Sequence, residues 1–543
     1  MSPIAIPATR RVTPYGDAAL RVEVSGARRS NALAAAVRAA GLEGVTEAVA
    51  GFGSVLVLYD PDVAERDALS ARLRAIRPAG GRRRPKTVVV PASFDGPDLE
   101  EVGRLSGLGP DGVRRALCRA RLRVAMLGFA PGFAYLGGLP RALRGLPRRA
   151  TPRPAVPAGS VALAGPFAAL YPRATPGGWQ LVGRTDLELF DAAAPPYALL
   201  QPGDTVRLVP GDPAPPGPAP ARAPLIAPDG AVFGVEEPGL STTLQDRGRA
   251  GLAHLGVPGA GPADPVSFAL ANALVGNDPG AACLEATALG PTLVCREATH
   301  AAVVGPGALV TLDGRPVGAG RVVPVGRGQR LAVGSTGAGL RAYVAVRGGF
   351  LGPRVLGSRS SDRLSGLGPG PLAAGDELGA GPPGPAMADH LSPDAPGQAV
   401  GGRRTLRVLA TPGRGFARWP GEGPLGRPLR VEEASDRIGV RLRPEPDGPP
   451  GRGDLPSEAT TVGTVQIPPD GRPVVLGVDH ASLGGYPVAG VVIGADHGEL
   501  GQCRPGDEVV FEPVDAEDAD AARRRLGRSL GAAVAGTYPV AAG

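Results

Sequence analysis

The sequence predicts an α+β protein that is predominantly β, built from tandem related units behind a small α/β unit. Three observations support this fold class. Glycine (84) and proline (62) are abundant, yet 43% of the residues are apolar and fall in short strand-like runs, which is typical of a loop-rich β protein. A set of sequence blocks occurs twice, and only a few segments have helical periodicity.

The repeated blocks predict one β-rich unit used twice. The copies are Gly159–Leu163, Gly177–Trp179 and Gln201–Pro210, and then Gly463–Ile467, Gly484–Tyr486 and Arg504–Pro513. Their order is the same, and loops absorb small differences in spacing at little cost. Chance matching in a glycine-rich chain is the alternative, but it does not account well for three ordered blocks.

The patterns divide the chain into seven segments. Helices are expected at 31–40 and 64–76 in the first, at 265–275 in the fourth and at 516–530 in the last. The segments are a small α/β domain (1–84), a β unit (85–210), a Pro/Ala-rich linker (211–230), a second β unit (231–380), a weak linker (381–402), a third β unit (403–514), and a C-terminal helix and tail (515–543).

Composition excludes several classes of function. The net charge of +7 comes from arginine, since Lys86 is the only lysine, and these arginines are spread among acidic residues without aromatic partners, so no nucleic-acid partner is expected. The same lysine follows Pro85, which excludes both a Walker A loop and a biotin attachment site. No signal region or long apolar segment is present, so we expect a soluble, cytoplasmic protein without a membrane partner.

The four cysteines predict neither a disulfide framework nor a metal site. Cys118, Cys283, Cys295 and Cys503 lie far apart, with no CxxC and no nearby histidine. We expect reduced thiols in the core, and no metal ligands.

In the first half, a glycine- and proline-rich loop, Gly128–Pro140, is the leading candidate for binding. Its backbone amides can approach a ligand closely, although a tight structural loop is the alternative. Arginine, hydroxyl and aromatic side chains that follow it suit an anionic or planar substrate. The binding candidates here are Gly128, Pro131, Gly132, Tyr135, Arg153, Ser160, Trp179 and Arg184.

In the second half, polar residues follow several predicted strands. His254 lies among turn residues and is a candidate for catalysis, although it could instead be a structural histidine. Asp264 is also a candidate, although it stands where it could simply cap the helix that begins at Pro265. The loop 357–363 suits an anion pocket or salt-bridged packing. The catalytic candidates are His254, Asp264, Glu458 and Asp479, and the binding candidates are Arg359, Ser360, Asp362, Ser457, Gln466 and Tyr486. Arg437 and His480 belong to the same polar set.

Several of these motifs resemble a known family. GFAPGFAYLGGLP, VPAGSVALAG and TPGGWQLVGRT resemble the B subunit of prokaryotic 5-oxoprolinase, over residues 11–210. PGLSTTLQDRGRAGLAHLGVPGAGPADP, GSRSSDR, ASDRIGVRL, GTVQIPPDGRPVVL and GGYP resemble its C subunit, which is related to the carboxyltransferase region of urea amidolyase, over residues 232–513. The resemblance implies cyclophilin-like β-barrels, one in the first half and two in the second.

The resemblance also implies a function. A fused B and C pair is expected to act with a separate A-type subunit of 5-oxoprolinase in ATP-dependent opening of 5-oxoproline to glutamate, with ATP and Mg²⁺ as cofactors. In this hypothesis, phosphorylation of the lactam oxygen precedes attack by water, and we expect Arg153, Arg184 and Arg359 to balance phosphate charge. Two alternatives stay open: a biotin-dependent carboxyltransferase for urea-like substrates, and a non-enzymatic regulator resembling an inhibitor and antagonist pair of a sensor kinase. A homo-oligomer is also compatible with the sequence.

The chain departs from the family pattern at motif positions. Apolar or small residues stand at Leu117, 166–169, 304–307 and 482–483, where the family carries more polar groups. The second copy of the repeat keeps more hydrogen-bonding capacity than the first, with Thr464, Gln466 and Tyr486. We therefore expect any remaining chemistry in the last barrel and its neighbour.

Overall fold

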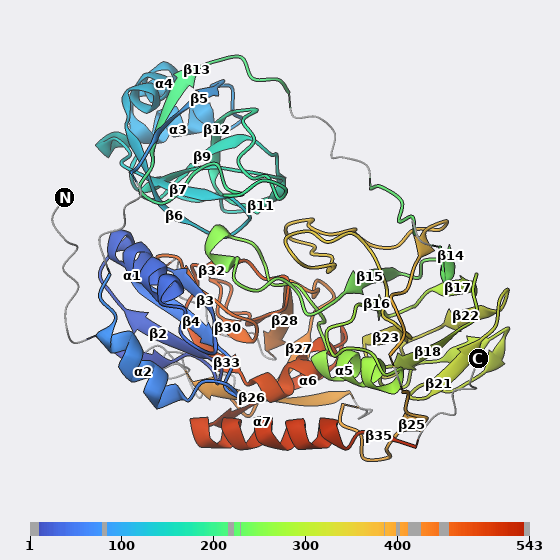
Figure 1. The fold of residues 1–543 in the computed structure, drawn as a ribbon. Coiled ribbons are helices and arrows are strands. Elements are labelled where there is room, and N and C mark those ends of the chain that lie inside the picture. The colour runs from blue at the N-terminus through green and yellow to red at the C-terminus, as the bar shows by residue number, and fades with distance from the viewer. Residues whose placement is uncertain are drawn as a thin grey trace.

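The computed structural model describes residues 10–78, 84–215, 222–227, 230–384, 386–397, 402–410, 425–444 and 455–536. The predicted linkers 211–230 and 381–402, and the predicted N- and C-terminal segments, lie partly outside these residues. The predominantly β fold is confirmed. Figure 1 shows a small α/β unit at the left, a barrel at the top, a two-sheet unit at the right and the last barrel behind the centre.

The small unit is a four-stranded sheet covered by two helices. Helix α1 begins at Ala27, four residues before the predicted start, and ends at Ala40, where the left-handed backbone of Gly41 caps it. Leu33 and Val37 of this helix are buried against the sheet. The strand order is β1-β2-β4-β3. The elements are β1 Val12–Pro14, β2 Ala19–Glu23, α1 Ala27–Ala40, β3 Val45–Ala50, β4 Ser54–Tyr59 and α2 Arg66–Ala75.

The first barrel is a seven-stranded sheet that nearly closes on itself. Its order is β12-β9-β10-β7-β6-β13-β5, and a bridge between Ser93 and Arg184 connects the two edges. The elements are β5 Thr87–Ala92, α3 Leu99–Ser106, α4 Gly109–Arg119, β6 Leu122–Leu127, β7 Ala134–Gly137, η1 Arg141–Leu143, β8 Arg153–Val156, β9 Ser160–Ala164, β10 Phe167–Leu170, β11 Thr175–Gly177, β12 Gln180–Arg184 and β13 Thr205–Pro210.

The third unit consists of a six-stranded and a five-stranded sheet around one apolar core. Helix α5 covers the smaller sheet. The elements are β14 Phe233–Glu237, β15 Ser241–Gln245, η2 Ala253–Leu255, α5 Pro265–Leu274, β16 Cys283–Thr287, β17 Thr292–Cys295, β18 Thr299–Val304, β19 Val310–Leu312, β20 Arg315–Pro316, β21 Val322–Val325, β22 Arg330–Val333, β23 Arg341–Val346, β24 Glu377–Leu378 and β25 His390–Leu391.

The last unit is a closed barrel of order β26-β33-β30-β31-β28-β27-β34. The elements are β26 Arg403–Ala410, β27 Pro428–Val431, β28 Gly439–Pro444, β29 Glu458–Ala459, β30 Thr464–Gln466, β31 Val474–Leu476, β32 Leu483–Gly484, β33 Val488–Val492, η4 Gly494–Asp496, α6 His497–Gly501, β34 Glu508–Val514, α7 Ala516–Gly531 and β35 Val534–Ala535.

The duplicated sequence blocks occupy matching places in the two barrels. Strands β13 and β34 carry the last block, and each pairs in parallel with the first strand of its barrel and antiparallel with the next strand. Strands β9 and β30 carry the first block. The repeat therefore reflects a shared strand topology.

An aspartate turn closes each of the three β units in the same way. Its carboxylate accepts the N–H of the residue three positions before it and a donor at the start of the unit. The sets are Asp204 with Gln201 and Lys86, Asp376 with Ala373 and Leu225, and Asp507 with Arg504 and the Arg404 Nε, at 2.9–3.0 Å. The turn thus connects the last strand of each unit to its beginning.

The two halves of the chain share an extensive contact. One buried apolar cluster contains Tyr15 of the small unit, Phe133 of the first barrel and Val491 of the last barrel. Helix α7 runs along the bottom of the molecule in Figure 1, and its Asp520 and Arg523 form ion pairs with the small unit. Segments far apart in sequence are therefore packed as one structure.

Candidate functional site

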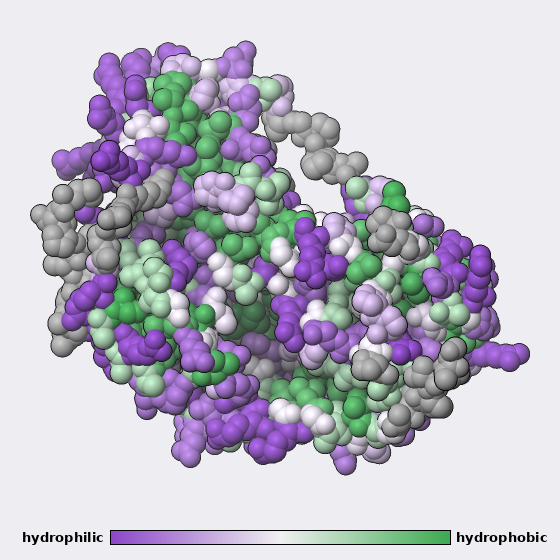
Figure 2. Space-filling view, in the orientation of Figure 1, coloured by the Kyte–Doolittle hydropathy of each residue, from purple (hydrophilic) through white to green (hydrophobic). Residues whose placement is uncertain are grey.

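Four loops from three units meet near the centre of the molecule, and this place is called the junction below. The loops are 128–133 of the first barrel, 253–263 and 358–365 of the third unit, and 477–483 of the last barrel. The surface is hollowed near the middle of the molecule in Figure 2, between the left and right units of Figure 1.

Backbone contacts hold the loops of the two halves together. The Gly132 N–H donates to the Leu255 carbonyl at 2.9 Å. Gly256 has a φ of 84°, and a side chain there would collide with the Ala130 carbonyl. A side chain at Gly128 would likewise collide with Leu483. The glycine-rich loop therefore serves close packing between units, in agreement with the structural alternative for it.

Arg437 is the centre of a buried ion network at the junction. Its Nε and Nη2 donate to the two carboxylate oxygens of Asp479 at 2.9 and 2.8 Å, and its Nη1 donates to Glu285 at 2.6 Å. Tyr343 donates to the other Glu285 oxygen at 2.6 Å. The side chains of Arg437, Asp479 and Glu285 are 6%, 0% and 1% exposed, so the network connects the third unit to the last barrel away from solvent.

Charge in this network decides the protonation of its members. Burial acts to raise the pKa of Glu285, but Arg437 and Arg341 outweigh it and hold the pKa below its usual value. Burial raises the pKa of Tyr343 well above its usual value, and the nearby charge of Glu285 adds to the effect. Glu285 therefore remains a carboxylate and Tyr343 a phenol.

Asp362 is the ionisable group at the junction with the most unusual environment. Burial raises its pKa to about 7, and the charge of Asp479 adds to this shift, while the Ser365 N–H opposes it. Its Oδ2 atom is buried without a hydrogen-bond partner among the described residues. Asp362 can therefore hold or release a proton near neutral pH.

The rest of loop 358–365 is organised by Asp246. The Ser358 and Ser360 hydroxyls donate to its Oδ1 at 2.5 and 2.7 Å, and the Arg359 N–H donates to its Oδ2 at 2.7 Å. Burial acts to raise the pKa of Asp246, but these donors hold the pKa below its usual value. The Arg359 Nε has no partner among the described residues, and burial lowers the pKa of Arg359.

Besides Asp479, two predicted catalytic residues lie in or beside the junction. The Nδ1 atom of His254 lies 3.7 Å from Glu47 of the small unit. Asp264 caps helix α5, because its Oδ1 accepts the N–H groups of Val266 and Ser267. This is the structural role that the sequence offered as the alternative to catalysis. Its Oδ2 accepts from Gln502 at 2.7 Å, so the carboxylate is occupied by structural bonds.

A second group of predicted residues lies between the first barrel, the small unit and the last barrel. The Tyr135 and Trp179 rings pack 5.9 Å apart in a buried aromatic cluster, and burial raises the pKa of Tyr135 while the Ser457 hydroxyl opposes the shift. The Gln466 Nε2 is buried without a partner among the described residues and lies against Gly484. The half-buried Tyr486 follows in the next turn.

Glu458 connects the last barrel to the small unit. Its carboxylate accepts the Gly53 N–H at 3.0 Å and the Ser54 hydroxyl, and Arg21 lies 4.0 Å away. The Phe52 N–H donates to the Ser457 carbonyl at 3.0 Å. This carboxylate stabilises the contact between units and is 20% exposed.

Three further binding candidates make bonds within the first half. Arg153 donates to Asp98 at 2.8 Å, and the Ser160 hydroxyl donates to the Pro157 carbonyl at 2.7 Å. Arg184 donates to the carbonyls of residues 213 and 214. These side chains therefore have local structural partners.

The sequence places Asp479 and Arg437 in one polar set but gives no role to Glu285 or Asp246. Glu285 stands in the middle of β16, whose other residues are mostly apolar, and a single carboxylate in a buried strand was the available signal. Asp246 belongs to the motif that opens the third unit, but its contact with loop 358–365 joins residues more than a hundred positions apart.

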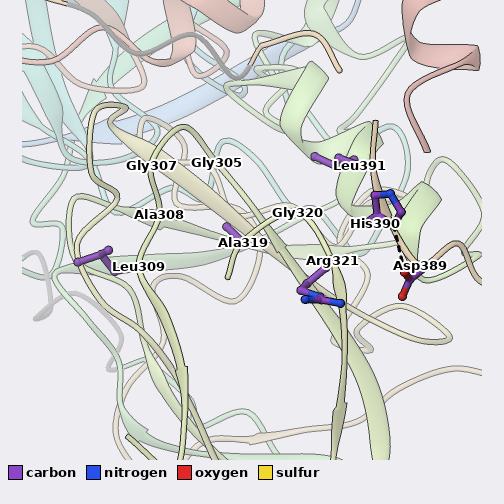
Figure 3. Close-up of a pocket in the computed structure, with 10 residues that line it drawn as sticks. All are labelled: Gly305, Gly307, Ala308, Leu309, Ala319, Gly320, Arg321, Asp389, His390 and Leu391. Atoms are coloured by element: carbon purple, nitrogen blue, oxygen red, sulfur yellow. Dashed lines mark hydrogen bonds and ion pairs between the residues drawn. The ribbon is translucent and has the colours of Figure 1, made fainter. Parts of the chain in front are cut away.

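A separate cavity of about 940 Å³ lies in the third unit (Figure 3). Its lining includes Gly305 and Gly307 from one of the segments that depart from the family pattern, and Arg321, Asp389 and His390. The predicted site residues do not line it.

Other predicted features concern cysteines, metals and membranes. All four cysteines are free, and three are buried, whereas Cys118 of α4 is only half-buried. Among the described residues, no cluster of three or more His, Cys, Asp or Glu side chains is arranged to bind a metal ion. In the same part of the chain no helix is both long and apolar enough to span a bilayer.

Two family models match the chain. The carboxyltransferase domain, subdomain C and D, matches residues 10–200, and the carboxyltransferase domain, subdomain A and B, matches residues 255–513. The junction therefore contains loops from both matched regions.

Named relatives match each half. The first half is 42% identical to the B subunit of 5-oxoprolinase from Escherichia coli O157:H7, with 32% of this chain and 82% of the relative covered. The second is 34% identical to the C subunit of 5-oxoprolinase from Escherichia coli K12, with 53% and 92% covered. Urea amidolyase of Lachancea kluyveri is 34% identical over 56% of this chain, but the chain spans only 18% of that protein.

A solved structure matches both halves together. The crystal structure of TTHA0988 is 37% identical, covers 93% of this chain and 100% of its own, and has a TM-score of 0.81. The arrangement of all four units therefore has a counterpart in a solved structure.

Proposed function

The chain belongs to the carboxyltransferase domain family that includes the B and C subunits of 5-oxoprolinase, and we propose that it combines both in an ATP-dependent 5-oxoprolinase. In this proposal a separate protein like the A-type subunit of 5-oxoprolinase completes the enzyme in the cytoplasm. The observation that carries the proposal is the junction, where the B-like loop 128–133 packs directly on the C-like loop 253–263. This contact supports a single unit built from the B-like and C-like halves.

The junction offers charges that suit a phosphorylated lactam. ATP supplies the phosphoryl group that activates the lactam oxygen, with Mg²⁺ bound to the nucleotide phosphates. Arg359 and Arg249 each have a buried guanidinium nitrogen without a partner among the described residues, and such nitrogens suit an anionic group. The fit of these residues to phosphate supports ATP as the co-substrate.

Asp362 has the properties of a proton donor in this reaction. Opening the lactam breaks the ring C–N bond, and the departing nitrogen must gain a proton. Because Asp362 is buried and holds a proton close to neutral pH, it can donate to that nitrogen. The buried pair of Arg437 and Asp479 keeps the neighbouring charge fixed.

An activity assay tests the proposal. The purified chain is mixed with the A-type protein, 5-oxoproline and Mg-ATP, and glutamate and ADP are measured. We expect glutamate only when both proteins and ATP are present. ATP consumption that does not depend on 5-oxoproline, without glutamate, would contradict the proposal.

A carboxyltransferase for urea-like substrates is the second candidate, and it is favoured by the description of the matched domains. It requires a partner that carries biotin, since Lys86, the only lysine, follows a proline. Transfer of carboxylate from a biotinylated carrier to urea, without hydrolysis of 5-oxoproline, would select this candidate. Calorimetry that detects neither ATP nor 5-oxoproline binding would instead favour a regulatory protein.

A further inference from the structure

His480 lies in the junction loop 477–483 with one ring nitrogen fixed by the backbone. Its Nδ1 is 2.8 Å from the Ala481 carbonyl oxygen. A carbonyl can only accept a hydrogen bond, so the Nδ1 must carry the proton. In the neutral ring, the Nε2 therefore holds the free electron pair.

The surroundings of the ring favour this neutral form. Burial lowers the pKa of His480, and the Ala481 carbonyl and the charge of Asp479 only partly oppose the shift. The Asp479 carboxylate is itself paired with Arg437. The Thr460 hydroxyl, which lies 3.3 Å from the Nδ1, donates to the same carbonyl and carries no charge. An imidazole in this environment is neutral at pH 7.

The free nitrogen of His480 is available for a ligand. Its Nε2 makes no hydrogen bond with the described residues, and the ring is half-buried rather than enclosed. By contrast, the Nε2 of His497 is buried without a partner, and His390 lies at the surface beside Asp389. His480 therefore combines an open lone pair with a fixed orientation.

Backbone contacts make the position of this ring rigid. The Gly477 N–H donates to the Ile438 carbonyl at 2.9 Å, and the Asp479 N–H donates to the Arg437 carbonyl at 3.0 Å. A side chain at Gly477 would collide with that same Arg437 carbonyl. The loop is thus held against the buried ion network, which is how a group is kept in place for proton transfer.

We propose that His480 is the proton acceptor of the junction, with its Nε2 as the accepting atom. The role rests on the proposed function. As water adds to the activated ring carbon, a C–O bond forms, one O–H bond of the water breaks, and its proton moves to the Nε2. The ring C–N bond then breaks with its electron pair on nitrogen, which takes up a proton, and the new hydroxyl loses its proton as the carbonyl re-forms, which leaves a carboxyl phosphate. A second water attacks the phosphorus, the bond between phosphorus and the carboxyl oxygen breaks, and phosphate and glutamate are released. His480 returns to its neutral form when its proton is released to the site.

Two measurements test this role. The first is His480→Asn, because the Asn amide can still donate to the Ala481 carbonyl but has no Nε2. We expect kcat for glutamate formation to fall by about 10²–10⁴-fold, a loss typical of a missing general base, together with loss of the acidic limb of the pH–rate profile. His390→Asn is the matched control and should retain wild-type kcat.

The second measurement requires no substrate turnover. The intact chain is treated with diethyl pyrocarbonate at pH 7, and each of the five histidines is followed by mass spectrometry. We expect rapid modification of His480, protection by 5-oxoproline, and slow modification of His497. An unreactive His480, or full activity in a folded His480→Asn variant, would overturn the proposal. Modification of His480 in a wild-type chain that forms no glutamate would reject the proposed function while supporting an available Nε2.

Discussion

Replacing Arg437 by methionine tests whether the buried network holds the third unit and the last barrel together. The variant loses four hydrogen bonds, three of them to Asp479 and Glu285 and one to the Gly261 carbonyl. Both carboxylates stay buried without the Arg437 guanidinium, and among the described cations Glu285 keeps only Arg341, at 3.4 Å. Removing one partner of such a pair costs about 3–5 kcal/mol, and we expect this loss in the free energy of unfolding at pH 7.5.

The loss in the free energy of unfolding caused by Arg437→Met should become smaller as the pH falls. In the wild type, burial acts to raise the pKa of Glu285, but Arg437 and Arg341 lower it overall, so its stabilising contribution is present at neutral pH and is lost as the pH falls. In the variant, burial is opposed by fewer charges, so the carboxyl takes up a proton in the folded state at higher pH. The destabilisation should therefore be smaller at pH 5 than at pH 7.5.

Urea unfolding at the two pH values, followed by circular dichroism, measures this effect. Arg330→Met is the matched control, because Arg330 pairs with Glu236 at the surface, with side chains 55% and 41% exposed. The control should leave the unfolding midpoint unchanged. A similarly small change for Arg437→Met, or a loss independent of pH, would refute the role assigned to the network.

Two further predictions concern Asp362 and the linker. Burial and the charge of Asp479 raise the pKa of Asp362 to about 7, so the wild type should lose stability as the pH rises from about 4 to about 7, and Asp362→Asn should be more stable relative to the wild type at pH 8 than at pH 5. An equal difference in melting temperature at both pH values would contradict this. A protease site placed in the linker, at 216–221, should give two fragments that elute together in gel filtration, because Glu458 and Arg523 bond across the halves. Separate elution of the fragments would show that the linker is required for the contact.

The predominantly β fold class could be predicted because it depends on local patterns. Helix α5 begins at Pro265, where the predicted Asp264 cap places its start. The Pro-Gly-Asp turns repeat because each aspartate bonds to a neighbour three residues away and to the start of its own unit. The early start of α1 was missed, since its first turn contains arginine and serine rather than apolar residues.

The site was predicted only in part, because its contacts are long-range. The loops with Asp362 and Asp479 were identified by their polar residues, but the sequence contains no signal that they meet. Arg153 and Arg184 look like phosphate ligands in sequence, yet Arg153 donates to Asp98 in its own barrel and Arg184 donates to the carbonyl of residue 213 in the linker. Packing decides whether an arginine keeps a guanidinium nitrogen without a partner among the described residues, as the Nε of Arg359 and the Nη1 of Arg153 both do.

Glutamate formation by the reconstituted enzyme tests whether this chain supplies the B and C functions of a 5-oxoprolinase. The chain, the A-type protein, Mg-ATP and isotope-labelled 5-oxoproline are combined, and labelled glutamate and ADP are quantified together. We predict one glutamate per ADP, and none when either protein is omitted. An A-type protein that forms glutamate with B and C proteins supplied separately, but not with this chain, would contradict it.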